Sequence, residues 1–186
     1  LWNDPTAQTG PTAANLAAGN YTVIVTDANG CTAQTQIEIN QPQALDAQIV
    51  SFSAPLCFGQ NNGSATVGVT GGTGAYAYLW NDPALQSFAT AANLAPGDYS
   101  VSIRDANNCA TSVSVSIPAT PAIVVEVLSQ SDPICAGDSN GSISVSASGG
   151  TGTLSYAWSN GPNSPALINL PAGNYTLSVT DGNGCV

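Results

Sequence analysis

The sequence predicts an all-β protein made of tandem immunoglobulin-like antiparallel β-sandwich domains. Three observations support this prediction: an internal repeat of about 78 residues, short segments in which apolar and polar residues alternate, and turn-forming residues between those segments. No long segment keeps the apolar period of a helix. The whole chain is therefore expected to consist of strands, turns and loops.

The repeat is clearest in one motif that occurs three times. It reads NLAAGNYTVIVTDANGC at residues 15–31 and returns, with few changes, at residues 93–109 and 169–185. A second motif, from Pro-x-Cys to Gly-Gly-Thr-Gly, occupies residues 55–74 and 133–152. Three tryptophans recur at the same interval: Trp2, Trp80 and Trp158. Long motifs that recur in register indicate one structural unit duplicated along the chain.

Each repeat contains segments with the period of a half-buried strand. Residues 99–104, 112–117 and 142–148 alternate apolar with polar side chains, which is typical of antiparallel strands with one face in the core. Glycine and proline at residues 71–72 and 96–97 supply turns between such segments. About seven short strands in a repeat of this length are expected for an immunoglobulin-like sandwich.

Two kinds of aromatic residue are predicted to fix the core of each sandwich. Trp80 and Trp158 fall on the strand that buries a tryptophan in immunoglobulin-like folds. A tyrosine that opens a later strand is predicted to bond back to upstream backbone, as a tyrosine corner. The candidates for this role are Tyr21, Tyr99 and Tyr175. The alternative for the aromatic stretch 76–80 is an exposed surface on which sugar rings stack.

Short proline-containing joints divide the chain. They lie at residues 41–42 and 118–121, each between a last strand and a new first strand. Residues 1–41 are predicted to be the C-terminal half of an immunoglobulin-like repeat, residues 43–118 a complete repeat, and residues 121–186 a repeat that lacks its last strand. We therefore expect the polypeptide to extend in both directions as an array, and the short joints to make that array stiff.

Composition excludes several functions. The 186 residues include 11 acidic side chains, a single basic one and no His, which gives a formal net charge of −10. Nucleic acids and anionic membrane surfaces are bound by clusters of Lys or Arg, so neither is expected as a partner. Apolar residues make up 43% of the chain, which is enough to build a core, and no apolar run is long enough to cross a membrane. No export signal opens the sequence, so we expect any such signal to lie elsewhere.

Five cysteines in a chain with so little charge are typical of an oxidising compartment. Cys57 and Cys135 precede the second strand of a repeat, whereas Cys31, Cys109 and Cys185 follow a later one. Pairing within a repeat, as Cys57–Cys109 and Cys135–Cys185, would close a loop in the unfolded chain and so stabilise each folded repeat by roughly 4 kcal/mol. These positions lie at opposite ends of a sandwich, however, and a disulfide needs Cα atoms within about 7 Å.

Two other cysteine pairings stay open. Repeats stacked end to end would bring Cys57 against Cys185, with Cys31 bonded to a preceding repeat and Cys135 to a following one. The remaining possibility pairs Cys31 with Cys57 and Cys109 with Cys135. The absence of His and of a Cys-x-x-Cys spacing argues against a metal site at the thiols.

Three aspartates are weak candidates for calcium ligands. Asp27, Asp105 and Asp181 each open an Asp-x-Asn turn, but a calcium loop needs several more oxygen ligands. Asp and Asn in a hairpin turn bond their own backbone, so we expect turns, with calcium at a joint as the alternative. No metal or other cofactor is predicted. Catalysis is not expected either, because the chain has no His, no Lys and no paired carboxylates.

The combined pattern GGTG…YxW…NLxxGxYxV…DxNGC resembles the SprB repeat. The resemblance covers essentially the whole chain; Asn108 replaces a turn glycine, and residues 153–154 are Thr-Leu where Pro-Tyr is common. Repeats of this family occur in very large cell-surface proteins of gliding bacteria that export through the type IX secretion system. The resemblance implies a mobile adhesin filament at the cell surface, and it assigns no catalytic residues.

The expected function is a structural repeat segment, a stiff stalk or filament, of a large extracellular surface adhesin used in gliding motility. The expected partners are adjacent repeats of the same chain, polysaccharide or substratum bound through other regions, and the secretion and gliding machinery. The alternatives are a polysaccharide-binding repeat and accessory domains of a secreted hydrolase. Ile24, on an otherwise polar strand face, is the one hint of lateral association between chains.

Overall fold

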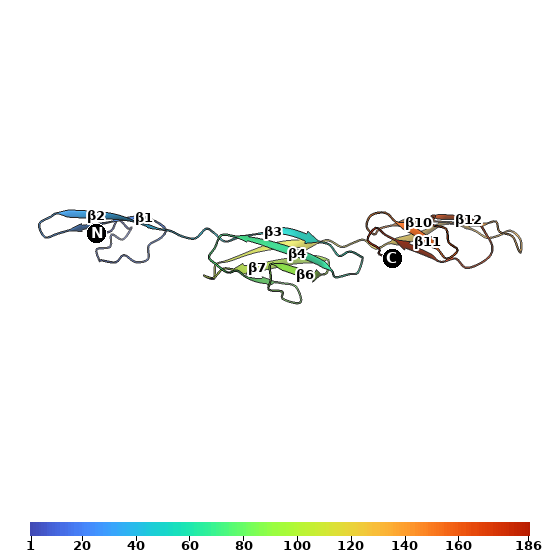
Figure 1. Cartoon of the computed structure of the whole chain (residues 1–186), viewed down its shortest axis with the longest axis horizontal. Helices are drawn as coiled ribbons and strands as arrows, with labels where there is room; N and C mark the ends of the chain where they lie inside the picture. Colours follow the sequence, from blue (N-terminus) through green and yellow to red (C-terminus); the bar gives the residue numbers. More distant parts are fainter.

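The fold is all-β and antiparallel, which confirms the predicted fold class. The structure, a computed structural model, describes residues 1–186 and contains thirteen strands, β1 to β13, and no helix. The strands form three bodies in a row along an extended molecule (Figure 1). We name them the N-terminal unit (residues 1–41), the middle unit (residues 43–118) and the C-terminal unit (residues 121–186). The structure contains no helix that could cross a membrane.

The middle unit is a sandwich of two three-stranded sheets, with orders β3-β4-β6 and β5-β7-β8. Its strands are β3 (Asp46–Ser53), β4 (Gly63–Thr70), β5 (Ala77–Trp80), β6 (Thr90–Leu94), β7 (Gly97–Arg104) and β8 (Ala110–Ile117). These are six strands, where about seven are expected from the repeat length. Between β5 and β6 the chain forms a loop around the Asp82 carboxylate, which accepts the N–H groups of Ala84 and Gln86.

The core of the middle unit lies between its two sheets. Alternate residues of β7 point inward, so Val101 and Ile103 are fully buried while Ser102 between them is exposed. Trp80 from β5 is also fully buried against them. Ten buried apolar residues form this cluster: Ala47, Ala65, Val67, Trp80, Ala91, Leu94, Val101, Ile103, Val115 and Ile117. Their removal from water is the main force that holds the sheets together.

The C-terminal unit repeats this arrangement with one strand fewer. Its sheets have orders β12-β10-β9 and β11-β13. The strands are β9 (Val124–Ser131), β10 (Gly141–Ser148), β11 (Ser155–Trp158), β12 (Ala166–Leu170) and β13 (Leu177–Thr180). Strand β13 is half as long as β7, because the first half of β7 pairs only with β8 and the C-terminal unit has no such strand. Its buried cluster has four members, so this unit is held together less strongly.

The N-terminal unit is a hairpin of β1 (Gly19–Thr26) and β2 (Thr32–Ile39), to which Trp2 adds an isolated bridge at Val23. No second sheet covers this hairpin. As a result Val25 is 63% exposed, although Ile103 at the matching position of the middle unit is fully buried.

Candidate functional site

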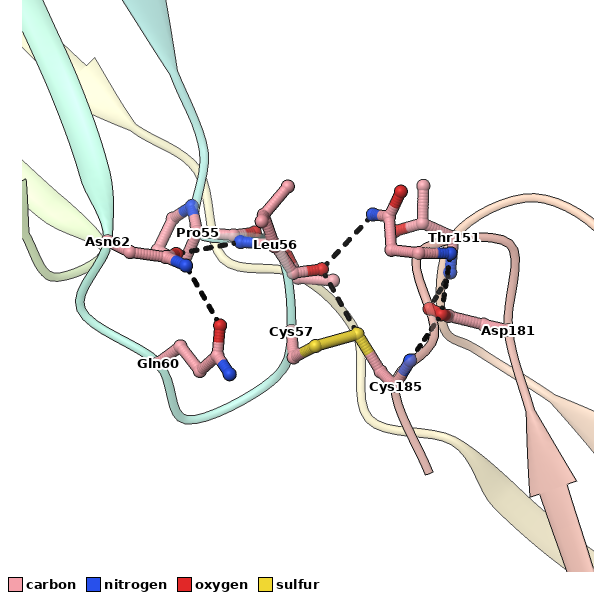
Figure 2. The surroundings of a disulfide bond; sticks show 10 residues. Pro55, Leu56, Cys57, Gln60, Asn62, Thr151, Asp181 and Cys185 are labelled. Carbon is pink, nitrogen blue, oxygen red and sulfur yellow. Dashed lines mark hydrogen bonds between the residues drawn. A yellow bond between two sulfur atoms is a disulfide. The ribbon is translucent and has the colours of Figure 1, made fainter.

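The middle and C-terminal units are joined by a disulfide bond. Cys57, in the loop between β3 and β4, is bonded to Cys185, in the turn after β13 (Figure 2). The two Cα atoms are 5.6 Å apart although the residues are 128 positions apart in sequence. The sequence left three pairings open, and the Cys57–Cys185 bond is the one expected for repeats stacked end to end. Cys31, Cys109 and Cys135 are free and exposed.

The loop that carries Cys57 is braced from within. Asn62 accepts a hydrogen bond from the N–H of Leu56 at 2.9 Å and donates one to the side chain of Gln60 at 3.0 Å (Figure 2). The N–H of Gln60 in turn donates to the carbonyl of Cys57 at 3.2 Å. These bonds leave the Leu56 carbonyl free to face the C-terminal unit. The loop therefore presents a fixed thiol position and a fixed acceptor side by side.

The turn that carries Cys185 is organised by one carboxylate. Asp181 Oδ1 accepts the N–H groups of Asn183 and Cys185, both at 2.9 Å, and Oδ2 accepts the N–H of Thr151 at 2.8 Å. The hydrogen bond from the Cys185 backbone is the largest influence on the pKa of Asp181, and it lowers that pKa despite the opposing effect of burial. Gly184 closes the turn at a φ of 82°, where a side chain would be strained.

Four contacts accompany the disulfide at the joint. Asn183 Nδ2 donates to the Leu56 carbonyl at 3.2 Å, and Cys185 Sγ lies 3.4 Å from the same oxygen. In the linker, the buried hydroxyl of Thr120 donates to the carbonyl of Pro55, which ties the linker to the middle unit. The next linker residue, Pro121, accepts the N–H of Gly150 at 3.1 Å and so ties the linker to the C-terminal unit. The joint is therefore fixed by both its backbone connection and its disulfide.

The two other Asp turns have the same internal bonding. Asp27 Oδ1 accepts the N–H groups two and four residues ahead, at 2.9 and 2.8 Å, and Asp105 Oδ1 does the same. Burial raises the pKa of Asp105, but the N–H groups of Thr73 and Cys109 outweigh it, so the pKa is lowered overall. Oxygens that already accept N–H groups are poorly placed to bind a cation, and this is the geometry of a turn.

No cluster of three or more His, Cys, Asp or Glu side chains that could hold a metal ion occurs in the chain. A groove of about 420 Å³ runs beside the disulfide, and its lining includes Phe58, Ile123 and Asp181. Its one carboxylate is the Asp181 group, whose oxygens accept the turn N–H groups. The groove therefore contains no acidic side chain apart from the one that organises the turn.

The predicted aromatic core residues face inward. Trp80 is fully buried and its indole N–H donates to the Phe88 carbonyl at 2.9 Å; Trp158 is buried and donates to the Ser164 carbonyl at 2.8 Å. Tyr76 and Tyr78, within the candidate sugar-stacking stretch, are half-buried and pack against the same core as Trp80. Trp80 has no exposed face on which a sugar could stack, so its geometry favours packing.

The three predicted corner tyrosines make the same hydrogen bond in each unit. Each hydroxyl donates to the carbonyl four residues upstream, at 3.0, 3.1 and 2.8 Å for Tyr21, Tyr99 and Tyr175. The bond holds the turn that precedes β7 in the middle unit. This shared bond gives each tyrosine a structural role in its unit.

One structural feature was missed at the sequence level. Asp82, only 3% exposed, accepts the N–H groups of Ala84 and Gln86 at 3.1 and 2.9 Å and the side-chain amide of Gln86 at 3.0 Å. Gln86 also exchanges two hydrogen bonds with the backbone of Ala92 in β6. Burial raises the pKa of Asp82, but these bonds, led by that of Gln86, lower it overall. The sequence could have revealed this loop, because the motif WNDPxxQ, which contains both the aspartate and the glutamine, occurs at residues 2–8 and again at 80–86.

Comparison with known families gives one match, which occurs twice. The family model of the SprB repeat matches residues 50–85 and 127–163. These segments occupy equivalent positions, since each runs from the first strand of a unit past its buried tryptophan. A search of curated proteins gives no match to the chain.

Proposed function

We propose that this chain, which carries SprB repeats in its middle and C-terminal units, is a stiff stalk segment of a large cell-surface adhesin that serves gliding motility. The observation that carries the proposal is the Cys57–Cys185 bond, because it links neighbouring units at a second point beside the linker. A joint held at two separate points resists both bending and twisting. A row of such joints is a rod, which can hold a distal binding region away from the cell.

The position of the disulfide also suits a segment under tension. Force applied between the chain ends would pass from Cys57 to Cys185 through the sulfur atoms and bypass the residues between them. Those residues include β4 to β13, that is, most of both sandwiches. The strands would therefore stay folded under a load that unfolds ordinary tandem domains one by one.

An extracellular location fits the same bond. Structural disulfides persist in oxidising surroundings and are rare in reducing ones. In this proposal the repeats contact adjacent repeats of their own chain, while other regions of the adhesin contact the substratum and the secretion and gliding machinery. The chain acts without catalysis or cofactor. The buried positions of Trp80 and Trp158 speak against the rival function in which each repeat grips polysaccharide through them.

Single-molecule stretching of the chain, tethered at residues 1 and 186, tests the stalk proposal. The 128 positions that the disulfide encloses correspond to about 45 nm of extended chain. In oxidising buffer we expect this length to stay hidden at forces that unfold single β-sandwiches. After addition of a reducing agent, about 45 nm should appear in steps that correspond to the two units.

The matched control is the chain with Cys109→Ser, which removes an exposed free thiol and leaves the disulfide intact. This variant should behave like the unmodified chain. Release of the full length in oxidising buffer, without a change on reduction, would contradict the role as a tension-bearing segment.

A further inference from the structure

Strand β8 leaves one edge of the middle unit unpaired. It is the outer strand of the β5-β7-β8 sheet, and its eight residues, Ala110–Ile117, include no charged side chain and no proline. We propose that this edge pairs antiparallel with the same edge of a second copy of the chain, so that two β5-β7-β8 sheets become one continuous sheet. The pairing involves the middle unit alone and is independent of the stalk role.

The other outer strands of the molecule carry features that discourage such pairing. Exposed edges are commonly blunted by short length, by charge or by a bulge. Strands β5, β6, β11, β12 and β13 have only four or five residues, and β2 and β9 carry Glu38 and Glu126. Strand β3 is interrupted by a bulge at Val50, and β1 is bridged on its outer side by Trp2. Strand β8 is therefore the long, regular and uncharged edge of the molecule.

The hydrogen bonds of the β7–β8 ladder show which residues of β8 face the free edge. In an antiparallel ladder, pairs that exchange hydrogen bonds alternate with pairs that do not. The N–H of Asp105 donates to the Cys109 carbonyl at 3.0 Å, and this pair sets the phase of the ladder. Ser100, opposite Ser114, instead exchanges hydrogen bonds with Asn81 on the side of β5. The N–H and carbonyl groups that face the free edge therefore belong to Ala110, Ser112, Ser114 and Ser116.

One register of the proposed pairing uses every outward residue. Ala110 pairs with Ser116 of the second copy, Ser112 pairs with Ser114, and the two-fold axis gives the reciprocal pairs. Val113 then lies beside Val113 of the second copy at the axis. Because the same edge serves both copies, the contact closes as a dimer and leaves no free β8 edge to recruit a third chain.

This register also brings opposite charges into one row. Arg104, the only basic side chain of the chain, lies opposite Ala110, and Asp98 lies opposite Ser116; both charged side chains are exposed. With Ala110 beside Ser116 of the second copy, Arg104 and the second copy's Asp98 are three strand spacings apart, about 14 Å between Cα atoms. The side chains between them are small, so the long Arg104 side chain can extend toward the carboxylate. The axis repeats this attraction at the other end of the ladder.

A partly apolar groove beside β8 would be covered by the same contact. It has a volume of about 670 Å³ and is lined by residues 49–52 of β3 and 114–116 of β8. Val50 and Phe52 are 64% and 55% exposed, although Phe52 lies opposite the fully buried Ala65. A strand placed along β8 would close the groove and remove both side chains from water, which favours association.

Sedimentation velocity tests the pairing on the full 186-residue chain with Cys31→Ser, Cys109→Ser and Cys135→Ser, which prevent disulfides between copies. We expect a monomer–dimer equilibrium that shifts to the dimer as concentration rises. Amide hydrogen exchange, measured by NMR, should slow at Ser112, Ser114 and Ser116 in step with the dimer fraction. A chain that stays monomeric, or a dimer whose new protection lies in β1 around Ile24, would overturn the proposal.

Ser114→Pro removes an outward N–H and no bond to β7, so the unit should keep its circular dichroism spectrum. The dimer should weaken by about tenfold or more, because the two-fold axis makes one lost donor into two lost hydrogen bonds. Gln36→Pro is the matched control, since Gln36 has the equivalent place in β2, and it should leave the dimer unchanged.

A charge exchange tests the register without a change to β8. Arg104→Glu and Asp98→Arg should each weaken the dimer several-fold, and more strongly at low salt, where the attraction is less screened. The double variant places opposite charges in the same row again and should restore the dimer. Failure of the double variant to restore it, or an equal loss in Gln36→Pro and Ser114→Pro, would contradict the pairing.

Discussion

Replacing Cys57 and Cys185 together by serine should destabilise the C-terminal unit far more than the middle unit. The C-terminal unit has the smaller buried cluster and is expected to unfold first. With the middle unit still folded, the disulfide closes a loop of roughly 65 residues, whose entropy corresponds to about 4 kcal/mol. When the middle unit then unfolds, the enclosed loop only doubles in length to 128 positions. The disulfide therefore stabilises the middle unit by only about 0.6 kcal/mol, the loop-closure entropy of that doubling.

Hydrogen exchange measured by mass spectrometry along a urea series gives the stability of each unit separately. The double serine variant should lose about 4 kcal/mol in peptides of β10 to β13 and less than about 1 kcal/mol in peptides of β4 to β8. Cys109→Ser is the matched control and should change neither unit. An equal loss in both units, or no loss in either, would refute the reasoning.

Four further results are expected. Trp80→Ala, which empties a fully buried site, should lower the stability of the middle unit by about 3–5 kcal/mol in urea denaturation, and a loss below about 1 kcal/mol would argue against its place in the core. Tyr99→Phe removes the bond to the Ala95 carbonyl and should cost about 1 kcal/mol by the same assay, whereas no loss would mean that the bond contributes nothing. Because folding lowers the pKa of Asp82, the ionised carboxylate stabilises the folded chain above the ordinary pKa of 3.8, and this stabilisation is lost as the pH falls below that value. The melting temperature should therefore fall between pH 7 and pH 2, and it should fall less in Asp82→Asn. Calcium should leave the melting temperature unchanged, since the Asp181 oxygens accept N–H groups, and a rise would contradict that assignment.

Much of the fold could be predicted, because alternation along a strand directly reports which face is buried. The pattern of residues 99–104 predicted β7, and the buried positions Val101 and Ile103 follow from it. The number of strands was harder to predict. About seven strands were expected in a repeat and the middle unit has six; the segment after Trp80 is a loop held by the Asp82 carboxylate, which no periodic pattern reveals.

The cysteine pairing could not be fixed from the sequence for a different reason. Spacing within one repeat favours Cys57–Cys109, whereas the Cys57–Cys185 bond depends on how two separate units stack. That arrangement comes from Thr120 and Asn183, which bond to backbone carbonyls of the middle unit. Neither residue belongs to an apolar pattern or a catalytic motif, so only the three-dimensional structure identifies them as parts of the joint.

Peptide mapping of the disulfides tests the central claim, a covalent joint between neighbouring units, most directly. The oxidised chain would be blocked with an alkylating reagent and digested with pepsin, because acid suppresses thiol exchange and the chain has a single basic residue for trypsin. We predict a linked peptide that contains Cys57 and Cys185, with Cys31, Cys109 and Cys135 alkylated in the monomer. A peptide that links Cys57 to Cys109 instead would place the bond inside one unit and contradict the joint.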